Sequence, residues 1–315
     1  MKDKSVLLDY FKENNPLVDR LTIKSKIFYR LLAFIICSIL YPLFTISEKY
    51  NKIYSDEIGS STIIQYIHII MILCYVISAI GIIYIIISLI FPAFANKISR
   101  NINFQAKKII FNILDWGMIL PICATIAVFF YTFIFIITPI SGTSMNPTIN
   151  DGDNILVSYL DEVDQFDVVV LEVNENDNFN VIGQTYYIKR VIGMPGDKIT
   201  WINKKLYVND NLIDEYYLEE GYLESFSSSE DFNGQFKYKD ESGKEVQTYI
   251  IPDGYYFVMG DNRTIHGSKD SRQIGLIKED NIIGVAKYFM NGIIPWGEVK
   301  WFNGIPVIWP KQLEK

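Results

Sequence analysis

Hydrophobic residues are concentrated in the first 140 positions of this 315-residue chain, in three long runs. A membrane-spanning helix needs about 20 mostly apolar residues, so each run is long enough to cross a bilayer. The second run is longer than necessary, which predicts tilt or an extension into the interface. About 26 polar residues precede the first run, which is not the pattern of a cleavable signal peptide. We therefore predict a polar segment at 1–26 and a membrane domain at 27–140, with transmembrane helices at about 27–46, 62–92 and 116–140.

After Ile140 the apolar positions fall in short β-rich runs separated by Gly, Pro, Asn and Asp. No long amphipathic helix interrupts these runs, which predicts a mostly antiparallel β domain of sandwich or partly open barrel type over 141–315. The stretch 219–247 is rich in Ser, Asp, Glu and Gly and is predicted to be a surface insertion or flexible loop. The Trp-rich tail at 291–315 fits either a core segment or a surface resting on lipid.

Basic residues predict the orientation of the helices. The linker 96–108 carries four Lys or Arg residues and no acid, whereas the linker 47–61 carries two lysines against three acids. The positive-inside rule then places the N-terminus and the second linker in the cytoplasm, and 141–315 outside it. His68, in the second run, is interpreted as a neutral histidine that faces another helix.

Composition limits the chemistry that the chain can perform. The net charge of −7 gives no support for nucleic-acid binding. Cys37, Cys74 and Cys123 all lie in the apolar runs, so the β domain has no cysteine for a disulfide or a metal site. His68 and His266 are too few for a histidine-rich metal centre. We expect neither a metal nor another cofactor.

Residues 141–148, with the sequence SGTSMNPT, follow directly after the last apolar run. Ser144 has small neighbours that leave room for a substrate backbone, and Pro147 stiffens the chain behind it. By themselves these residues also suit an ordinary turn. The position close to the last helix predicts that the Ser144 hydroxyl lies near the outer surface of the membrane, where an enzyme cutting beside the bilayer requires it.

A serine hydroxyl needs a base to become a good nucleophile. Lys189 lies in the stretch YIKRVIGMPGD, within an apolar run typical of a strand. Burial there disfavours the ammonium, and lowering its pKa from about 10.4 to about 7–8 costs roughly 4 kcal/mol, as documented for buried lysines. A neutral Lys189 can accept the proton of Ser144. The spacing alone favours a surface lysine beside a solvated Arg190.

A third stretch, MGDNRTIHGSKDSRQIG at 259–275, completes a pattern. The three stretches, in this order, resemble the bacterial type I signal peptidases (leader peptidases) over roughly the second half of the chain. The resemblance implies the signal peptidase fold, with Ser144 as nucleophile and Lys189 as base of a Ser–Lys dyad. It also implies that Ser268 hydrogen-bonds to the lysine and that Asp270 and Arg272 form a pair that holds the site.

Two features depart from the family's pattern. The residues TIHG add about two positions between GDNR and SKDSR, so the family's pattern does not determine the path of this loop. Some family members place an oxyanion-stabilising serine two positions before the nucleophile, where this chain has Gly142. The candidate oxyanion donors are therefore the backbone N–H of Ser144 and a second group, either another backbone N–H or the hydroxyl of Thr143 or Ser141.

The resemblance implies a membrane-bound serine endopeptidase that removes signal peptides from exported preproteins at small-x-small sites such as Ala-x-Ala. Shallow apolar pockets for small side chains are expected, with Met145, Ile188 and 154–157 as candidate lining, and the substrate is expected to bind as an added strand. The expected partners are preproteins and the lipid bilayer, without nucleic acid. We expect a monomer near the secretion translocon, multi-pass in the bacterial cytoplasmic (inner) membrane.

Two alternatives stay open. A Ser144–His266 pair, oriented by Asp270 or Asp261, would match the eukaryotic endomembrane signal peptidases, although the motif around Lys189 is intact. A noncatalytic membrane protein of the same fold could instead bind signal peptides or act as a scaffold, although the presence of both dyad residues argues against it. Three spans and the lack of a DNA-binding segment exclude a soluble self-cleaving repressor.

Overall fold

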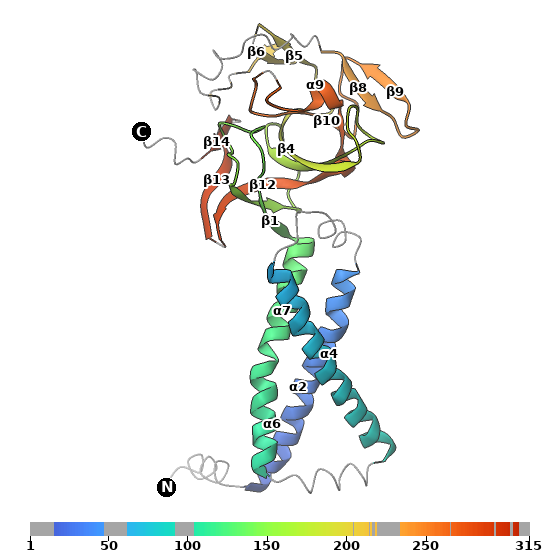
Figure 1. The fold of residues 1–315 in the computed structure, drawn as a ribbon, viewed down its shortest axis with the longest axis vertical. Coiled ribbons are helices and arrows are strands. Elements are labelled where there is room, and N and C mark those ends of the chain that lie inside the picture. Colours follow the sequence, from blue (N-terminus) through green and yellow to red (C-terminus); the bar gives the residue numbers. More distant parts are fainter. Residues whose placement is uncertain are drawn as a thin grey trace, which may run out of the picture. The chain divides into compact units, whose positions relative to one another are not determined.

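The computed structural model divides the chain into two compact units, Met1–Phe133 and Ile134–Lys315 (Figure 1). The description that follows covers residues 16–46, 62–91, 104–203, 205–213, 215, 218, 234–264, 266–292, 294–302 and 305–308.

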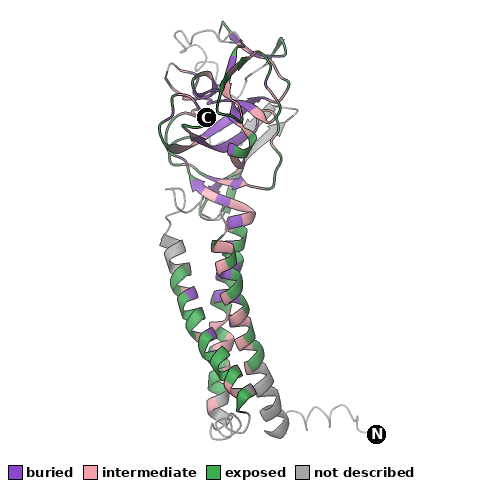
Figure 2. Cartoon of the chain, turned by 90° about the vertical axis from the view of Figure 1, so that its right-hand side faces the viewer, coloured by how far each residue is buried: buried purple, intermediate pink, exposed green. Residues whose placement is uncertain are grey.

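The first unit is helical. Its helices are α2 (Pro16–Thr45), α4 (Thr62–Ile90), α6 (Phe104–Gly117) and α7 (Ile119–Phe133). Three segments are long and apolar enough to cross a membrane, with α6 and α7 together supplying the third: Ile27–Thr45, His68–Ile87 and Lys108–Phe133. Many large apolar side chains of these helices are exposed (Figure 2), as expected of surfaces that face lipid.

Polar side chains join the helices of this unit around a small buried cluster that includes Phe34, Met71 and Val128. The Tyr41 hydroxyl of α2 lies 2.8 Å from Nδ1 of His68 on α4, so the predicted contact of this histidine with another helix is confirmed. The hydroxyls of Ser38 and Ser78 also lie 2.8 Å apart. Arg30 of α2 pairs with Asp115 of α6. Such contacts satisfy polar groups that lipid cannot.

The third helix ends earlier than predicted. The apolar run continues to Ile140, but α7 stops at Phe133, and Phe135–Pro139 form strand β1, paired in antiparallel fashion with β2 (Asn154–Ser158). The predicted span 116–140 and the domain boundary after residue 140 are therefore wrong at this end. The reason is that β-branched residues in this run, among them Ile136, pack with alternating burial in a sheet.

The second unit is a mostly antiparallel β domain, as predicted. Its main sheet has the order β1-β2-β12-β3-β4-β10-β11, and β13 and β14 extend from β12. Besides β1 and β2, its strands are β3 (Val168–Asn174), β4 (Gln184–Gly193), β10 (Tyr255–Met259), β11 (Ile277–Lys278), β12 (Ile282–Asn291), β13 (Ile294–Phe302) and β14 (Ile305–Ile308). Two smaller sheets consist of β5 (Ile199–Ile202), β6 (Lys205–Val208) and β7 (Asn211–Leu212), and of β8 (Phe236–Lys239) and β9 (Glu245–Thr248). Short helical turns, α9 (Ser271–Ile274) and η1 (Glu279–Asn281), precede and follow β11.

The central strands of the main sheet are covered on both faces. Successive side chains of a strand point to opposite faces. Val258 belongs to one buried cluster, with Val191 and Leu171, whereas its neighbour Phe257 belongs to a second, with Ile192. A core on each face explains why six consecutive residues of β3 are buried, and it means that charged residues of β4 are buried on whichever face they occupy.

Part of the predicted flexible insertion belongs to the core. Residues 219–233 of the predicted 219–247 segment lie outside the described residues, but the remainder forms the β8–β9 hairpin. Phe236 is buried against Phe257, with ring centroids 5.3 Å apart. The prediction of a surface loop is wrong here because one apolar residue anchors an otherwise polar hairpin. In the tail, 294–302 and 305–308 form strands, while the side chains of Trp296, Trp301 and Trp309 lie outside the description.

We expect Phe236→Ala to destabilise the β domain by about 3–5 kcal/mol, because it removes a buried aromatic side chain and leaves a cavity. For a domain of this size the midpoint of thermal unfolding should fall by about 10 °C or more. The neighbouring Lys237→Ala, at a half-exposed side chain, should change the midpoint little. Equal effects of the two substitutions would contradict the buried anchor.

Candidate active site

Ser144 lies in a tight turn between β1 and β2. Met145 and Ile149 are buried, and the Ile149 N–H donates to the Met145 carbonyl at 3.0 Å, which fixes the turn against the core. Gly142 adopts φ +98°, a conformation that favours glycine, and its N–H donates to Asp151 at 2.7 Å. The hydroxyl of Ser144 is thus presented from an anchored segment, half-buried.

Strand β4 brings Lys189 to this serine. Lys189 pairs with Val169 of β3 and is only 2% exposed. Its Nζ donates to Ser144 Oγ at 2.8 Å and to the Ile188 carbonyl at 2.8 Å. The structure therefore brings together two residues that are 45 positions apart in the sequence.

Burial lowers the pKa of Lys189 from 10.5 to about 8, because the ammonium loses its hydration. The negative charges of Asp270 and Asp261 oppose this effect but do not cancel it. The nitrogen also lies 5.0 Å from the ring centroid of Tyr187. An amine with this pKa is partly neutral near physiological pH and can accept a proton.

Asp270 and Arg272 form the predicted pair on the loop that enters α9. Arg272 donates from Nε and Nη2 to the two carboxylate oxygens, each at 2.8 Å, and Gly260 N–H donates to the same carboxylate at 3.1 Å. Burial raises the pKa of Asp270, but the charge and hydrogen bonds of Arg272, the bond from Gly260 and the charge of Lys189 outweigh it and lower the pKa. The carboxylate is thus held ionised beside the lysine.

Ser268 is buried near the dyad, but the predicted hydrogen bond to Lys189 is not formed. Within the described part of the chain its hydroxyl has no hydrogen-bond partner. A side chain at Gly260 would collide with both the Ser268 hydroxyl and the Ser144 carbonyl. The close approach of these three residues therefore requires glycine at position 260.

A second buried ion pair lies behind the site and was not predicted. Arg190 donates to Asp261 at 2.9 and 2.6 Å, and both side chains are fully buried. Asp261 also accepts a hydrogen bond from Thr148 of the Ser144 turn. The alternation of β4 places Arg190 on the opposite face from Lys189. Because the sheet is buried on both faces, that position demands a charged partner, which is the signal that could have identified the pair.

The segment after Asp261 holds the nucleophile's turn directly. Asn262 donates from its backbone N–H to the Ser144 carbonyl at 3.0 Å and from its side chain to the Thr143 carbonyl at 2.9 Å. Arg263, also buried, donates to the Gly260 carbonyl at 2.7 Å and pairs with Glu215 at 2.6 Å. The GDNR motif therefore positions the Ser144 turn through these hydrogen bonds.

The comparisons with known proteins identify the family of this chain. The family model of signal peptidases, peptidase S26, matches residues 113–290, more than half of the chain, and the match includes the three stretches at 141–148, 187–197 and 259–275. The chain belongs to this family. It is a serine peptidase of the bacterial type I signal peptidase kind, as the resemblance of the three stretches implied.

Individual relatives of this chain are also named as signal peptidases. Signal peptidase IB of Staphylococcus aureus strain COL is 38% identical over 182 residues, which cover 56% of this chain and 88% of the relative. Signal peptidase I T of Bacillus subtilis strain 168 is 31% identical over 207 residues, covering 64% and 96%. A crystal structure of a signal peptidase I from Enterococcus faecalis V583 is 26% identical and covers 40% of this chain and 97% of that one, with a TM-score of 0.29.

In this signal peptidase His266 does not reach the nucleophile. Its side chain is exposed on a residue with φ +59°, and no described hydrogen bond joins it to Ser144. Asp270 and Asp261, the two candidate orienters of a histidine, are instead paired with arginines. The geometry favours lysine over histidine as the base.

The oxyanion and pocket candidates differ in exposure. Ser141 and Thr143 are exposed, and within the described residues the Ser144 N–H has no acceptor, so it is free to bind an oxyanion. Met145 and Ile188 are buried, as are Ile155 and Val157. Within the described ranges, no group of three or more His, Cys, Asp or Glu side chains is arranged to hold a metal ion.

Breaking the buried Arg190–Asp261 pair should strongly destabilise the domain. We expect Asp261→Asn to cost about 3–5 kcal/mol, because it leaves a buried guanidinium without its counter-charge. The exposed pair of Lys198 and Asp210 provides the control, since Asp210→Asn should cost less than about 1 kcal/mol. Thermal unfolding followed by circular dichroism measures both, and similar midpoints for the two variants would refute the structural role of Asp261.

Proposed function

We propose that this signal peptidase is a membrane-bound endopeptidase that cleaves signal peptides from exported preproteins with a Ser144–Lys189 dyad. The observation that carries the proposal is the 2.8 Å contact between Ser144 Oγ and the buried Nζ of Lys189. A nucleophile within hydrogen-bonding distance of a base with a lowered pKa is the arrangement that serine acyl transfer requires.

The reaction follows from these positions. Neutral Lys189 takes the proton of Ser144 as Oγ attacks the scissile carbonyl, and the resulting ammonium then donates the proton to the leaving amine. The Ser144 N–H stabilises the oxyanion, together with Ser141 or Thr143. In the second half-reaction Lys189 activates a water that hydrolyses the acyl-enzyme. Asp270 and Arg272 support this cycle by holding the loop beside the lysine.

Cleavage after small-x-small sequences is supported by the packing around the nucleophile. Met145 and Ile188 flank the dyad in the sequence and are almost completely buried, as are Ile155 and Val157 of β2. Side chains this buried leave little open surface beside the dyad, which suits Ala-sized side chains of a substrate. Strand β1 ends the order of the main sheet, so an extended substrate can add to it through main-chain hydrogen bonds.

The proposed location is the bacterial cytoplasmic membrane. Three apolar helices support a multi-pass anchor, and the basic linker at 96–108 supports a cytoplasmic N-terminus with the β domain outside. We propose that the enzyme acts as a monomer near the translocon, where preproteins emerge.

Activity should rise with pH through a midpoint of about 8. A base with this pKa is about one tenth neutral at pH 7 and about nine tenths neutral at pH 9, so kcat/KM should increase about tenfold between these two pH values. The pH dependence of kcat/KM measures the midpoint. A profile that is flat between pH 6 and 9 would show that the titration of Lys189 does not limit catalysis.

The proposed function is tested by incubating the full-length enzyme in detergent with a preprotein that carries an Ala-x-Ala site. Mass spectrometry of the product should locate a single cut after the second alanine. Replacing the alanine at −1 with tryptophan in the substrate should abolish this cut. A folded enzyme that binds the preprotein but never cleaves it would leave the signal-peptide-binding or scaffold alternative.

A further inference from the structure

A cavity of about 570 Å³ lies in the β domain beside α9. It is open to solvent on one side and is lined by the loop between β3 and β4, by the β8–β9 hairpin and by α9 itself. Its lining includes Arg272 but neither Ser144 nor Lys189, so it is distinct from the dyad. The polar lining side chains are Asn180, Gln235, Lys237, Glu245, Arg272 and Gln273.

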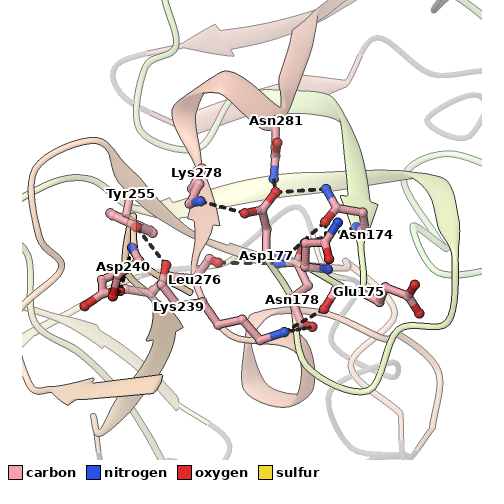
Figure 3. Close-up of polar contacts among 12 residues, drawn as sticks. Asn174, Glu175, Asp177, Asn178, Lys239, Asp240, Tyr255, Leu276, Lys278 and Asn281 are labelled. Atoms are coloured by element: carbon pink, nitrogen blue, oxygen red, sulfur yellow. Dashed lines mark hydrogen bonds and ion pairs between the residues drawn. The ribbon is translucent and has the colours of Figure 1, made fainter. Parts of the chain in front are cut away.

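The walls of this cavity are tied together by polar contacts (Figure 3). Asp177 in the β3–β4 loop binds Lys278 of β11 at 2.6 Å, and Lys239 of β8 donates to the carbonyls of Glu175 and Asn178 at 2.6 and 3.3 Å. Backbone bonds complete the frame: Phe179 N–H donates to the Ile274 carbonyl and Leu276 N–H to the Lys237 carbonyl. Ligand pockets in proteins are usually preformed by such fixed walls, and their volumes are about 300–1,000 Å³.

Two cations on the lining keep unused donors. Arg272 binds Asp270 through Nε and Nη2, and within the described residues its Nη1 group has no hydrogen-bond partner. Lys237 faces Glu245 across the hairpin at 3.5 Å, a long separation for an ion pair, and both side chains are about half exposed. Each cation can therefore bind an incoming carboxylate without losing a tight contact.

The amide side chains of the lining indicate which class of molecule the carboxylate belongs to. Asn180, Gln235 and Gln273 can each donate and accept hydrogen bonds, which matches the peptide group. A phosphate or a simple carboxylic acid would use only the donors. Of these three, Asn180 donates to the Gln273 carbonyl and Gln235 donates to the side-chain oxygen of Gln247, each at 3.0 Å, so these contacts orient two of the amides.

We propose that this cavity binds an acidic peptide segment in extended form, with its carboxylates on Arg272 and Lys237 and its peptide groups on the amide side chains. The mature part of a preprotein and a separate acidic polypeptide present the same chemistry. Binding at this site does not depend on the dyad, so it can be tested independently of the proposed catalytic function.

The test measures binding by calorimetry to the full-length protein in detergent, in the Ser144→Ala background to prevent cleavage. The probe is the acetylated, amidated tripeptide Glu-Ser-Glu, and Gln-Ser-Gln is its uncharged match. We expect the acidic peptide to bind at least about tenfold more tightly, because its charges meet the two cations.

Two substitutions should act in opposite directions. Lys237→Gln should weaken binding of the acidic peptide about fivefold, whereas Glu245→Gln should strengthen it, because it removes a competing carboxylate. Lys244→Gln and Glu241→Gln, in the turn of the same hairpin and outside the lining, should have no effect. Absence of binding, equal affinity for the two peptides, or equal effects of the lining and turn substitutions would overturn the proposal.

Discussion

Ser144→Ala should reduce preprotein cleavage by on the order of 10⁶-fold. Removing a nucleophile from a coupled serine site costs about as much as removing the whole catalytic unit, since the remaining base has no group to activate. Binding of the signal peptide should persist, because an alanine at this position keeps the turn and its backbone N–H. Initial rates with a fluorogenic preprotein peptide, together with the affinity for an uncleavable analogue, measure both effects.

The control for this prediction is Ser242→Ala. Ser242 lies exposed in the β8–β9 turn and hydrogen-bonds locally to Asp240, so its loss should leave the rate unchanged. The thermal midpoint of Ser144→Ala should also match that of the wild type, because only one half-buried hydroxyl is removed. Residual cleavage within tenfold of the wild type would exclude Ser144 as the nucleophile.

Lys189→Met should lower kcat/KM by at least about 10⁴-fold, the upper range of general-base catalysis. Methionine keeps an unbranched, apolar side chain in the same buried space and removes a buried charge, so the domain should remain folded. Lys189→Arg should be similarly inactive, because a guanidinium stays protonated and cannot accept the Ser144 proton. Single-turnover measurements separate this loss from any change in product release.

Surface lysines provide the matched control for Lys189. Lys198, paired with Asp210 at the surface, should tolerate methionine without loss of rate. Activity of Lys189→Arg within about tenfold of the wild type would show that proton acceptance by this residue is not required.

The candidate pair Ser144 and Lys189 could be identified from the sequence because its signal is local. Ser144 and Lys189 lie in short motifs that occur in the same order as in the signal peptidases. The apolar strand pattern around Lys189 is compatible with its burial. The structure adds the contact between them, which depends on how the turn after β1 meets β4. Spacing alone favoured a surface lysine, since it does not fix which segments are neighbours, and the family resemblance reversed that interpretation.

Other features depend on partners far away in the sequence. The segment Phe135–Pro139 is as apolar as the helix before it, and only its pairing with β2 makes it a strand. Arg190 finds Asp261 across 71 positions. Phe236 looks like an isolated apolar residue in a polar stretch until it packs on Phe257. Composition cannot distinguish a buried strand from a membrane helix, nor a core anchor from a loop residue.

The most direct test of the catalytic account compares His266→Ala with Lys189→Met on one Ala-x-Ala preprotein at pH 8.5. His266 is exposed, and no described hydrogen bond joins it to Ser144, whereas Lys189 donates to Ser144 at 2.8 Å. We predict the wild-type rate for His266→Ala and no measurable cleavage for Lys189→Met. Loss of cleavage in His266→Ala with retention in Lys189→Met would contradict the dyad and assign the base to histidine.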